Sequence, residues 1–478
     1  MLKKYSLYIV SFLVLLFIAY NSYLLADEKY FALVLPFVVA IIALALLKLD
    51  VLLLLVAFLT PLSTSLQELG IYNPLGLEMA LPTEPLLFGL MIITWLKMFS
   101  DKESFKGLYR HPISLAVGAY LVWLFISSLC SSLPIASLKM LITRIWFICP
   151  YFVLGYVWFK QKSNFKKFIL AYFSGLSIVA LYTIYQHSLL GFEHEAAHWV
   201  MSPFFKDHTS YGMALALILP AGLYLIKTSK NLNEKLLFSV LSTLLILSTV
   251  LSYTRAAWLS LIAAAGVYML IKLRIRFSYL LSTAFLLVAF VFVFQGDLLM
   301  VLEKNSQDSS DSFTEHISSM SNVSTDASNL ERINRWNSAI QLFQEKPHIG
   351  WGPGTYQFHY APYQNYYDKT IISTNAGNMG NAHSEYLSAL AETGWPGLLI
   401  FLVMIAVIFT KAIVLYPKLS DKEEQWMLMA CILGLVTYFT HAFLNNFLDM
   451  DKASVPIWAF IALIVVLDSK HKSKEIRA

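Results

Sequence analysis

Arg255 and Arg144 are the first candidates for chemistry, because each is a cation in or beside a long apolar segment. Arg255 lies in Leu251-Ser-Tyr-Thr-Arg-Ala-Ala-Trp258, between two such segments, and Arg144 lies one turn into another. A guanidinium group stays charged and donates parallel hydrogen bonds, which suits phosphate oxygens. Ionisable residues at membrane depth indicate a functional site by default. We therefore expect both arginines to bind phosphate, with contact to lipid headgroups as the alternative.

Arg332 and Arg335 form a second pair of cations. They are three residues apart in a stretch with helical periodicity, so they share one face of the expected helix. Two such cations can bind the two phosphates of a diphosphate. The alternative for Arg335 is an ordinary solvated face.

His383 is the candidate proton acceptor. It lies in Gly380-Asn-Ala-His-Ser-Glu-Tyr386, just before an apolar segment. Imidazole near pH 7 can take a proton from a hydroxyl. Glu385 and Glu392 are nearby acids that could orient it. Position alone leaves polar surface as the alternative.

The stretch from Trp351 to Tyr367 is rich in aromatic residues. Aromatic rings either stack on sugar faces or anchor a loop at the headgroup layer, and the two roles are compatible. We expect Trp351, Tyr356 and Tyr360, with Glu385, to contact a glycan or its acceptor.

Several other chemistries are excluded. The sequence has no nucleotide-binding loop, dinucleotide fingerprint or serine nucleophile elbow, so the energy for any reaction must come with the substrate. The histidines of segment 187–208 match no common metal spacing, and Cys130, Cys149 and Cys431 lie in apolar segments. We expect no metal, no cofactor and, without a basic tract, no nucleic-acid partner.

The elements that position these residues belong to a membrane protein. Hydrophobic residues make up 58% of the 478 and charged residues only 14%, against roughly 25% charged in soluble domains. A span needs about 20 mostly apolar residues, and the runs are too long for barrel strands. Tyr5–Leu25 is longer than the core of a signal peptide, so we expect an uncleaved first span. Fourteen helical spans are expected near 5–26, 31–47, 49–66, 84–99, 113–130, 138–159, 168–190, 210–226, 236–252, 256–271, 277–295, 395–411, 425–447 and 454–468. Three of these are short, so twelve is the alternative.

Charge predicts the orientation. Most Lys and Arg residues fall in alternate connections, and the tail carries four more, which places both termini in the cytoplasm. The chain then divides into an N-terminal bundle of about eleven spans (1–295), a large external loop (296–394), and about three C-terminal spans with a basic cytoplasmic tail (395–478).

The external loop is expected to be partly helical. Asn305 to Asn329 is rich in Ser, Asp and Asn and is typical of a mobile tether. A capping box at Ser328 and Glu331 precedes a helix whose apolar face is Ile333, Trp336, Ile340 and Phe343. A second helix is expected over 381–393, and Gly394-Trp395-Pro396 opens the next span.

Three stretches together resemble the O-antigen ligase and polymerase family. They are Ser252-Tyr-Thr-Arg-Ala-Ala-Trp258, then Arg332-Ile-Asn-Arg-Trp336 with Lys346-Pro-His-Ile-Gly-Trp-Gly-Pro-Gly354, then Asn381-Ala-His-Ser-Glu-Tyr-Leu387 with Ala391-Glu-Thr-Gly-Trp-Pro-Gly397. They occur in family order over about 200 residues. Ser384 stands where the family usually has Asn, which leaves open the side-chain partner of the histidine.

The resemblance implies a GT-C-like, metal-independent, inverting glycosyltransferase of the bacterial inner membrane. It would move a glycan from undecaprenyl diphosphate to an acceptor hydroxyl, such as that of lipid A-core, on the periplasmic face. By position, Arg255 and Arg332 would hold the diphosphate and His383 would activate the hydroxyl. A polysaccharide polymerase and a protein O-oligosaccharyltransferase use the same residues and stay open. A lipid-linked glycan flippase or transporter is the alternative from another class, although the chain has no internal repeat.

Overall fold

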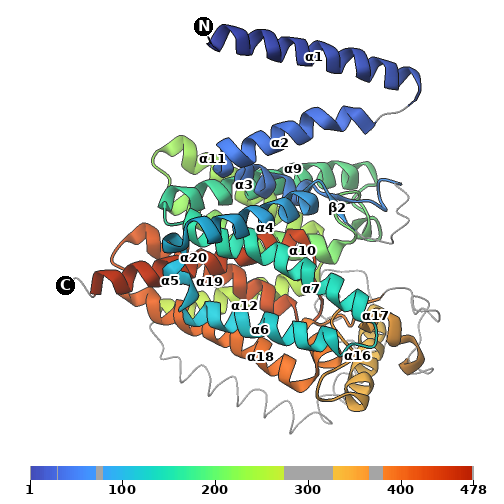
Figure 1. Cartoon of the computed structure of the whole chain (residues 1–478). Coiled ribbons are helices and arrows are strands. Elements are labelled where there is room, and N and C mark those ends of the chain that lie inside the picture. Colours follow the sequence, from blue (N-terminus) through green and yellow to red (C-terminus); the bar gives the residue numbers. More distant parts are fainter. Residues whose placement is uncertain (1, 29–30, 71–78, 274–326, 365–379, 476–478) are drawn as a thin grey trace, which may run out of the picture. The chain divides into compact units, whose positions relative to one another are not determined.

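The computed structural model describes residues 2–28, 31–70, 79–273, 327–364 and 380–475 (Figure 1). The chain forms two compact units, Met1–Leu55 and Val56–Ala478. The first contains α1 (Leu2–Ala26), the short η1 (Phe31–Val34), α2 (Leu35–Leu47) and the start of α3 (Leu49–Leu59). These helices are mostly apolar, and a proline in the first turn of α2 suits its start.

The second unit is built almost entirely of long helices. They are α4 (Thr83–Ser100), α6 (Pro112–Leu129), α7 (Pro134–Ile148), α9 (Lys162–Leu189), α10 (His208–Lys227), α11 (Leu232–Leu251), α12 (Arg255–Lys272), α18 (Glu385–Leu415), α19 (Lys422–His441) and α20 (Asp451–Glu475). Short elements are η2 (Thr60–Leu62), α5 (Lys102–Tyr109), α8 (Gly155–Trp158), η4 (Ala196–His198), α16 (Ala327–Glu345), α17 (Tyr356–His359), η5 (Ala361–Tyr363) and η7 (Tyr416–Lys418). A π-helical stretch, η3 (Cys149–Leu154), joins α7 to α8. Strands β1 (Thr64–Ser65) and β2 (Ala80–Leu81) pair antiparallel, with Thr64 opposite Leu81.

The helices begin where the sequence supplies a cap. Asp207 accepts a hydrogen bond from the Ser210 amide at the start of α10, and Asn231 accepts one from Glu234 at the start of α11. Such side chains satisfy amide groups that have no partner within the helix. Proline occupies the first turn of α6 and α7, where its missing N–H costs nothing.

The predicted all-α polytopic membrane fold is confirmed. Among the described residues, eight helices are long and apolar enough to cross a membrane. These stretches are Pro112–Leu129, Pro134–Trp158, Lys162–Leu189, His208–Lys227, Leu232–Leu251, Arg255–Lys272, Glu385–Lys418 and Asp451–Ser473. The first three expected spans form shorter apolar helices, and those at 84–99 and 425–447 form α4 and α19, which carry charges in their terminal turns. The expected span 277–295 lies outside the described residues.

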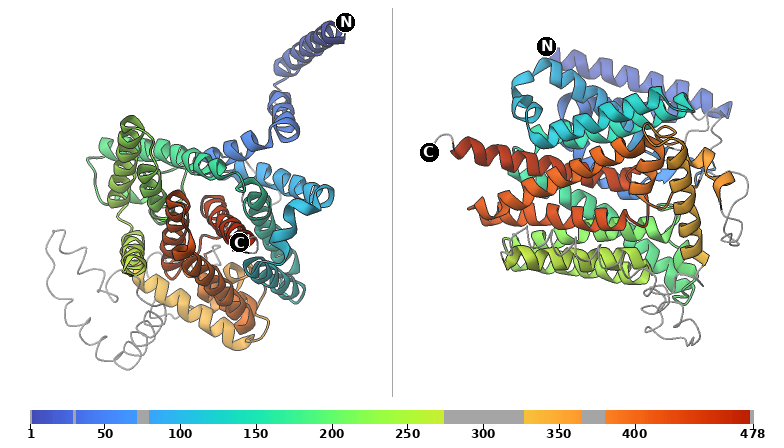
Figure 2. Two further views of the ribbon diagram at one scale, coloured as in Figure 1. Left: turned by 90° about the vertical axis from the view of Figure 1, so that its left-hand side faces the viewer. Right: turned by 90° about the horizontal axis from the view of Figure 1, so that it is seen from below.

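The core of the second unit lies around α20. In the apolar stretch of α20 that is long enough to cross a membrane, 94% of the residues are buried, against 22% in the corresponding stretch of α12. Viewed along the helices, α20 is surrounded by the others (Figure 2, left). Its Trp458 and the Phe460 ring pack against Phe152 and Phe165 from neighbouring helices.

The connections of the second unit divide between its two ends. Those at 130–133, 190–207, 252–254 and 442–450 lie at one end, where Ser132 binds the loop before α17 and His194 packs against Tyr253 (Figure 1). The lysine-rich connections meet at the other end, where Lys162 pairs with Asp421 at 2.6 Å and Lys470 with Glu424 at 2.6 Å. Successive helices therefore alternate in direction, as the charge pattern predicts.

Helix α16 lies across the ends of the long helices of the second unit (Figure 2, right). Its inward face is not the expected apolar stripe, because Ile340 is 40% exposed. The buried positions are instead Glu331, Asn334, Arg335, Ser338, Ala339 and Leu342. They keep the helical period but are mostly polar, because this face carries the contacts that surround the candidate site.

Gly394 joins the first two turns of α18 to its long apolar part. The helix breaks there, at φ 70° and ψ −179°, and resumes through Pro396. This left-handed backbone favours glycine, and a side chain at this position would collide with the backbone of Pro347 and His348. The predicted opening of the span at 394–396 is therefore observed, although α18 begins at Glu385 rather than at Asn381.

Candidate functional site

His383 lies at the entrance to α18, in a backbone conformation that other contacts must maintain. Its φ is 48°, in the left-handed region that a residue with a side chain rarely adopts. Its amide donates to Asn381 Oδ1 at 3.0 Å, and Trp336 Nε1 donates to its carbonyl at 3.3 Å. Ser384 caps α18 by accepting from the Leu387 amide. Strain of this kind persists where the surroundings over-determine it, which is common at functional sites.

The imidazole of His383 is held neutral. Burial, followed by the charges of Arg335 and Arg332, lowers the pKa of His383 to about 3, while Asp207 and Asn445 act in the opposite direction. Near pH 7 the ring therefore keeps a lone pair on one nitrogen. That is the form a general base requires.

The positive charge of Arg332 acts on several imidazole rings. It is partly buried on α16, and its field reaches the rings of His383, of His441 at the end of α19 and of His208 at the start of α10. The start of α10 and the two consecutive helices α18 and α19 thus each bring an imidazole within the field of this one cation.

Arg335 is engaged by the protein itself. Its side chain is buried, and its Nε donates to Glu331 Oε1 at 2.6 Å while Nη1 donates to the Asn381 carbonyl at 3.1 Å. Its guanidinium lies over the Tyr360 ring, 5.0 Å from the centroid. Arg335 therefore fastens α16 to the turn that carries His383.

Arg255 is the first residue of α12. The preceding Thr254 donates through Oγ1 to the carbonyl of His208 at 2.7 Å, so the starts of α12 and α10 touch. Because His208 also feels the charge of Arg332, the two arginines border one region. Helix N-termini attract anions, so Arg255 lies where the backbone also favours a negative charge.

Arg144 and Glu385 lie in a buried ionic cluster. Arg144 Nη2 is 2.7 Å from Asp449 Oδ1 and 3.9 Å from Glu385 Oε2. Glu385 Oε1 also accepts hydrogen bonds from Tyr438 Oη and from the amides of Phe447 and Leu448. Both residues therefore anchor the 442–450 connection. Burial raises the pKa of Asp449 to about 6, against the pull of Arg144.

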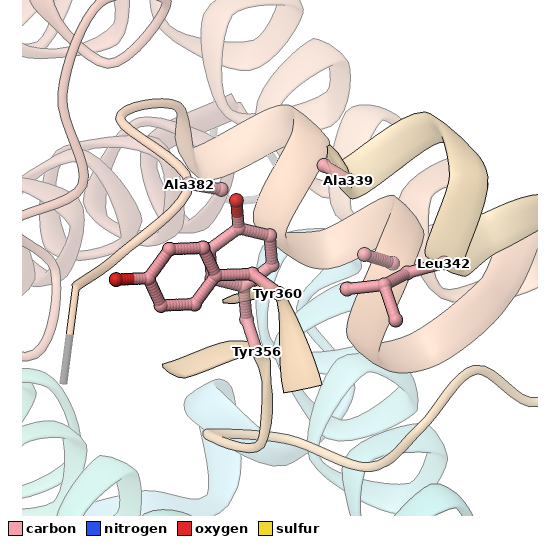
Figure 3. Packing of buried hydrophobic residues seen from close by; sticks show 6 residues of the cluster. Ala339, Leu342, Tyr356, Tyr360 and Ala382 are labelled. Carbon is pink, nitrogen blue, oxygen red and sulfur yellow. The ribbon is translucent and has the colours of Figure 1, made fainter. Parts of the chain in front are cut away.

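The aromatic candidates divide into two groups. Tyr356 and Tyr360 stack with ring centroids 5.2 Å apart and are at most 2% exposed (Figure 3). They pack among Ala339, Leu342, Ala382 and Ala391, and Tyr356 Oη donates to the Arg335 carbonyl at 2.8 Å. Trp351 is partly exposed, with Lys346 Nζ 4.0 Å above its ring. The tyrosines therefore support α16 from inside, and Trp351 alone of the three offers ring surface.

The loop before α17 packs against the connection between α6 and α7 and against α18. The Ser132 amide donates to the Trp351 carbonyl at 3.0 Å, and the Gly352 amide donates to the Glu392 carbonyl at 2.8 Å. Gly352 has φ 112°, and a side chain there would collide with Ser131. This close approach explains the glycines of the loop.

Sequence reasoning missed Asp207 and Asn445, which act on His383, together with His441, which contacts Asn445, and His208, which shares the charge of Arg332. Asp207 caps the start of α10, and an aspartate before a helix is a signal that the sequence does contain. Burial raises the pKa of Asp207, but hydrogen bonds from Ser210 and Thr209 outweigh it and lower the pKa. His208 was weighed only as a metal ligand. Asn445 carried no signal, because the stretch around it was assigned to a membrane span. Within the described ranges, no three His, Cys, Asp or Glu side chains are grouped so as to hold a metal ion.

Comparison with known families gives one match. Residues 237–402 match the family model described as O-Antigen ligase. The matched segment starts in α11, contains Arg255, Arg332, Arg335 and His383, and ends in α18 beyond Gly394. No curated protein matches the chain.

Proposed function

The chain belongs to the O-antigen ligase family, and on that premise we propose that it transfers a glycan from undecaprenyl diphosphate to an acceptor hydroxyl, such as that of lipid A-core. The observation that carries this proposal is the neutral imidazole of His383 beside the cation Arg332, with Arg255 at the adjoining helix start. A proton acceptor next to anion-binding groups is what transfer from a diphosphate requires.

In this mechanism His383 takes the proton of the acceptor hydroxyl. The hydroxyl oxygen then forms a bond to the anomeric carbon while the bond from that carbon to the diphosphate oxygen breaks. Negative charge grows on the departing lipid diphosphate, where Arg255 and Arg332 stabilise it. Attack opposite the leaving group inverts the anomeric centre.

The remaining candidates take supporting roles in the proposal. Arg335 positions the turn that carries His383, and Arg144 with Glu385 anchors the connection after α19. Tyr356 and Tyr360 form the base on which Arg335 rests, and Trp351 is left as the aromatic contact for a sugar. No step of this mechanism requires a metal or cofactor.

We place the site at the periplasmic face of the bacterial inner membrane. The lysine-rich connections at the opposite end of the second unit then face the cytoplasm, together with both chain ends. The division of the chain into a bundle over 1–295, an external segment over 296–394 and C-terminal helices over 395–478 follows from the same orientation.

The test is the envelope glycan profile of a deletion strain complemented with the wild-type gene. Long chains stranded on the lipid carrier, with bare acceptor, are the expected result for a ligase. Acceptor capped with a single repeat unit would instead identify a polymerase, and loss of glycan from proteins would identify an oligosaccharyltransferase. An unchanged profile would overturn the proposal and favour a transporter.

Arg255→Lys is expected to lower the transfer rate. Lysine keeps the charge but cannot donate two parallel hydrogen bonds, and a charge-assisted bond is worth about 1.5–3 kcal/mol. The loss should therefore be roughly tenfold to a hundredfold, measured as kcat/KM for the lipid-linked donor. Arg110→Lys, at an exposed position beyond α5, is the control and should leave the rate unchanged. Wild-type transfer by Arg255→Lys would indicate that Arg255 contacts lipid headgroups instead.

A further inference from the structure

Asn445 bridges two histidines at the site. It lies in the 442–450 connection between α19 and α20 and is 2% exposed. Its Nδ2 is 3.0 Å from His441 Nε2, and its side chain also interacts with the His383 imidazole, where it opposes the effect of burial on the pKa of that ring. Because the side-chain amide of Asn445 is buried, its polar atoms depend on these two imidazoles for hydrogen bonds.

The direction of each bond follows from the chemistry of the amide. Nδ2 can only donate, so His441 Nε2 accepts and the proton of that ring is on Nδ1. The amide oxygen is then the atom left for His383, and it accepts from a ring N–H. The second nitrogen of His383 consequently carries the lone pair, so the bridge selects one tautomer.

Glu385 fixes the position of Asn445 relative to His383. Its amide donates to the Ala442 carbonyl at 3.0 Å, and its carboxylate accepts from the amides of Phe447 and Leu448 at 2.9 and 2.6 Å. His383 is two residues before Glu385, and Asn445 lies between the residues that Glu385 binds. The spacing between the two side chains is thereby set by the backbone.

We propose that Asn445 is a positioning residue that selects the reactive tautomer of His383, with His441 holding the amide in its orientation. This inference rests on the proposed function and supplies the side-chain partner that Ser384 does not, since Ser384 is used as a helix cap. It does not require Asn445 to touch either substrate.

The charged groups around His383 determine what a change at Asn445 does. Arg332 and Arg335 face it from α16, and Asp207 faces it from the start of α10. Together with burial, the two cations keep the wild-type imidazole neutral down to low pH, so kcat should stay flat on the acid side to about pH 5. An added anion at Asn445 would oppose them.

The experiment uses the purified full-length protein with lipid-linked glycan from the deletion strain and its acceptor. Asn445→Asp keeps an accepting oxygen but adds a negative charge, which raises the pKa of His383. Activity of this variant should therefore fall on the acid side at a higher pH than in the wild type. Asn445→Ala removes the acceptor and should lower kcat by about tenfold, with little change in the KM of the donor.

Asn446→Ala is the matched control. The side-chain amide of Asn446, next to Asn445 in the chain, donates to Ser388 Oγ at 3.1 Å. This variant therefore tests the stability of the same connection, and its kcat and pH profile should be those of the wild type. His441→Leu frees the amide to rotate and should lower kcat without an acid-side shift. It also provides a readout should Asn445→Asp fail to fold.

Three results would overturn the inference. They are unchanged kcat and pH profiles in both Asn445 variants, equal losses in Asn445→Ala and Asn446→Ala with equally lowered melting temperatures, and wild-type kcat in His441→Leu. Absence of transfer by the wild-type protein would instead reject the proposed function.

Discussion

Replacing His383 by alanine should lower glycan transfer by roughly 10²–10⁴-fold, the usual contribution of a positioned general base. The structure gives the physical reason, because the imidazole is held neutral beside the two arginines and is the proton acceptor that our mechanism requires. The measurement is the transfer rate of the purified variant with lipid-linked donor.

A second variant separates chemistry from folding. His383 has a φ of 48°, which asparagine tolerates better than alanine does. His383→Asn should therefore fold like the wild type and still be inactive. His348→Ala, an exposed histidine that bonds to Trp395, is the control and should keep full activity. Wild-type transfer by either His383 variant would remove the acid–base role.

Arg144→Met should have the largest effect on stability. The substitution leaves the carboxylates of Asp449 and Glu385 buried without their cation, and breaking a buried ion pair on one side costs about 3–5 kcal/mol. Such a loss is a large part of a typical stability, so the melting temperature in detergent should drop sharply. The measurement is thermal unfolding.

The outcome also decides between two roles for Arg144. Arg110→Met, at an exposed position, provides the control and should melt like the wild type. Adding Asp449→Asn to Arg144→Met removes one of the stranded charges and should recover part of the lost stability. An unchanged melting temperature together with lost transfer would mean that Arg144 binds the diphosphate, as its position in the sequence suggests.

The sequence predicts the helices well because each depends on local features. Apolar runs of membrane length, the prolines of the first turns and the Gly394-Trp395-Pro396 opening all act within a few residues. His383 and Arg255 were identified in the same local way. The alternation of lysine-rich connections predicts the direction of successive helices.

The contacts of the site depend on pairings that no local pattern encodes. Asp449, the partner of Arg144, lies about three hundred residues later in the chain. Asn445 acts on His383 from a stretch that the sequence predicts to be a membrane span. The inward face of α16 was misplaced for a related reason. Periodicity identifies apolar stripes, whereas this helix turns Glu331, Asn334 and Arg335 inward to partners on other segments.

Because the loop at Gly352 packs against α6 and α7, the segment that matches the family cannot be treated as a separate structural domain. The family match covers 237–402, yet that segment receives hydrogen bonds from Trp123, Ser127 and Ser132, which lie outside it. The loop around Gly352 and the α6–α7 hairpin therefore pack as one structural unit, although Ser127 and Ile349 are 222 residues apart in the chain. Exchange of substrate specificity between relatives would have to move both pieces together.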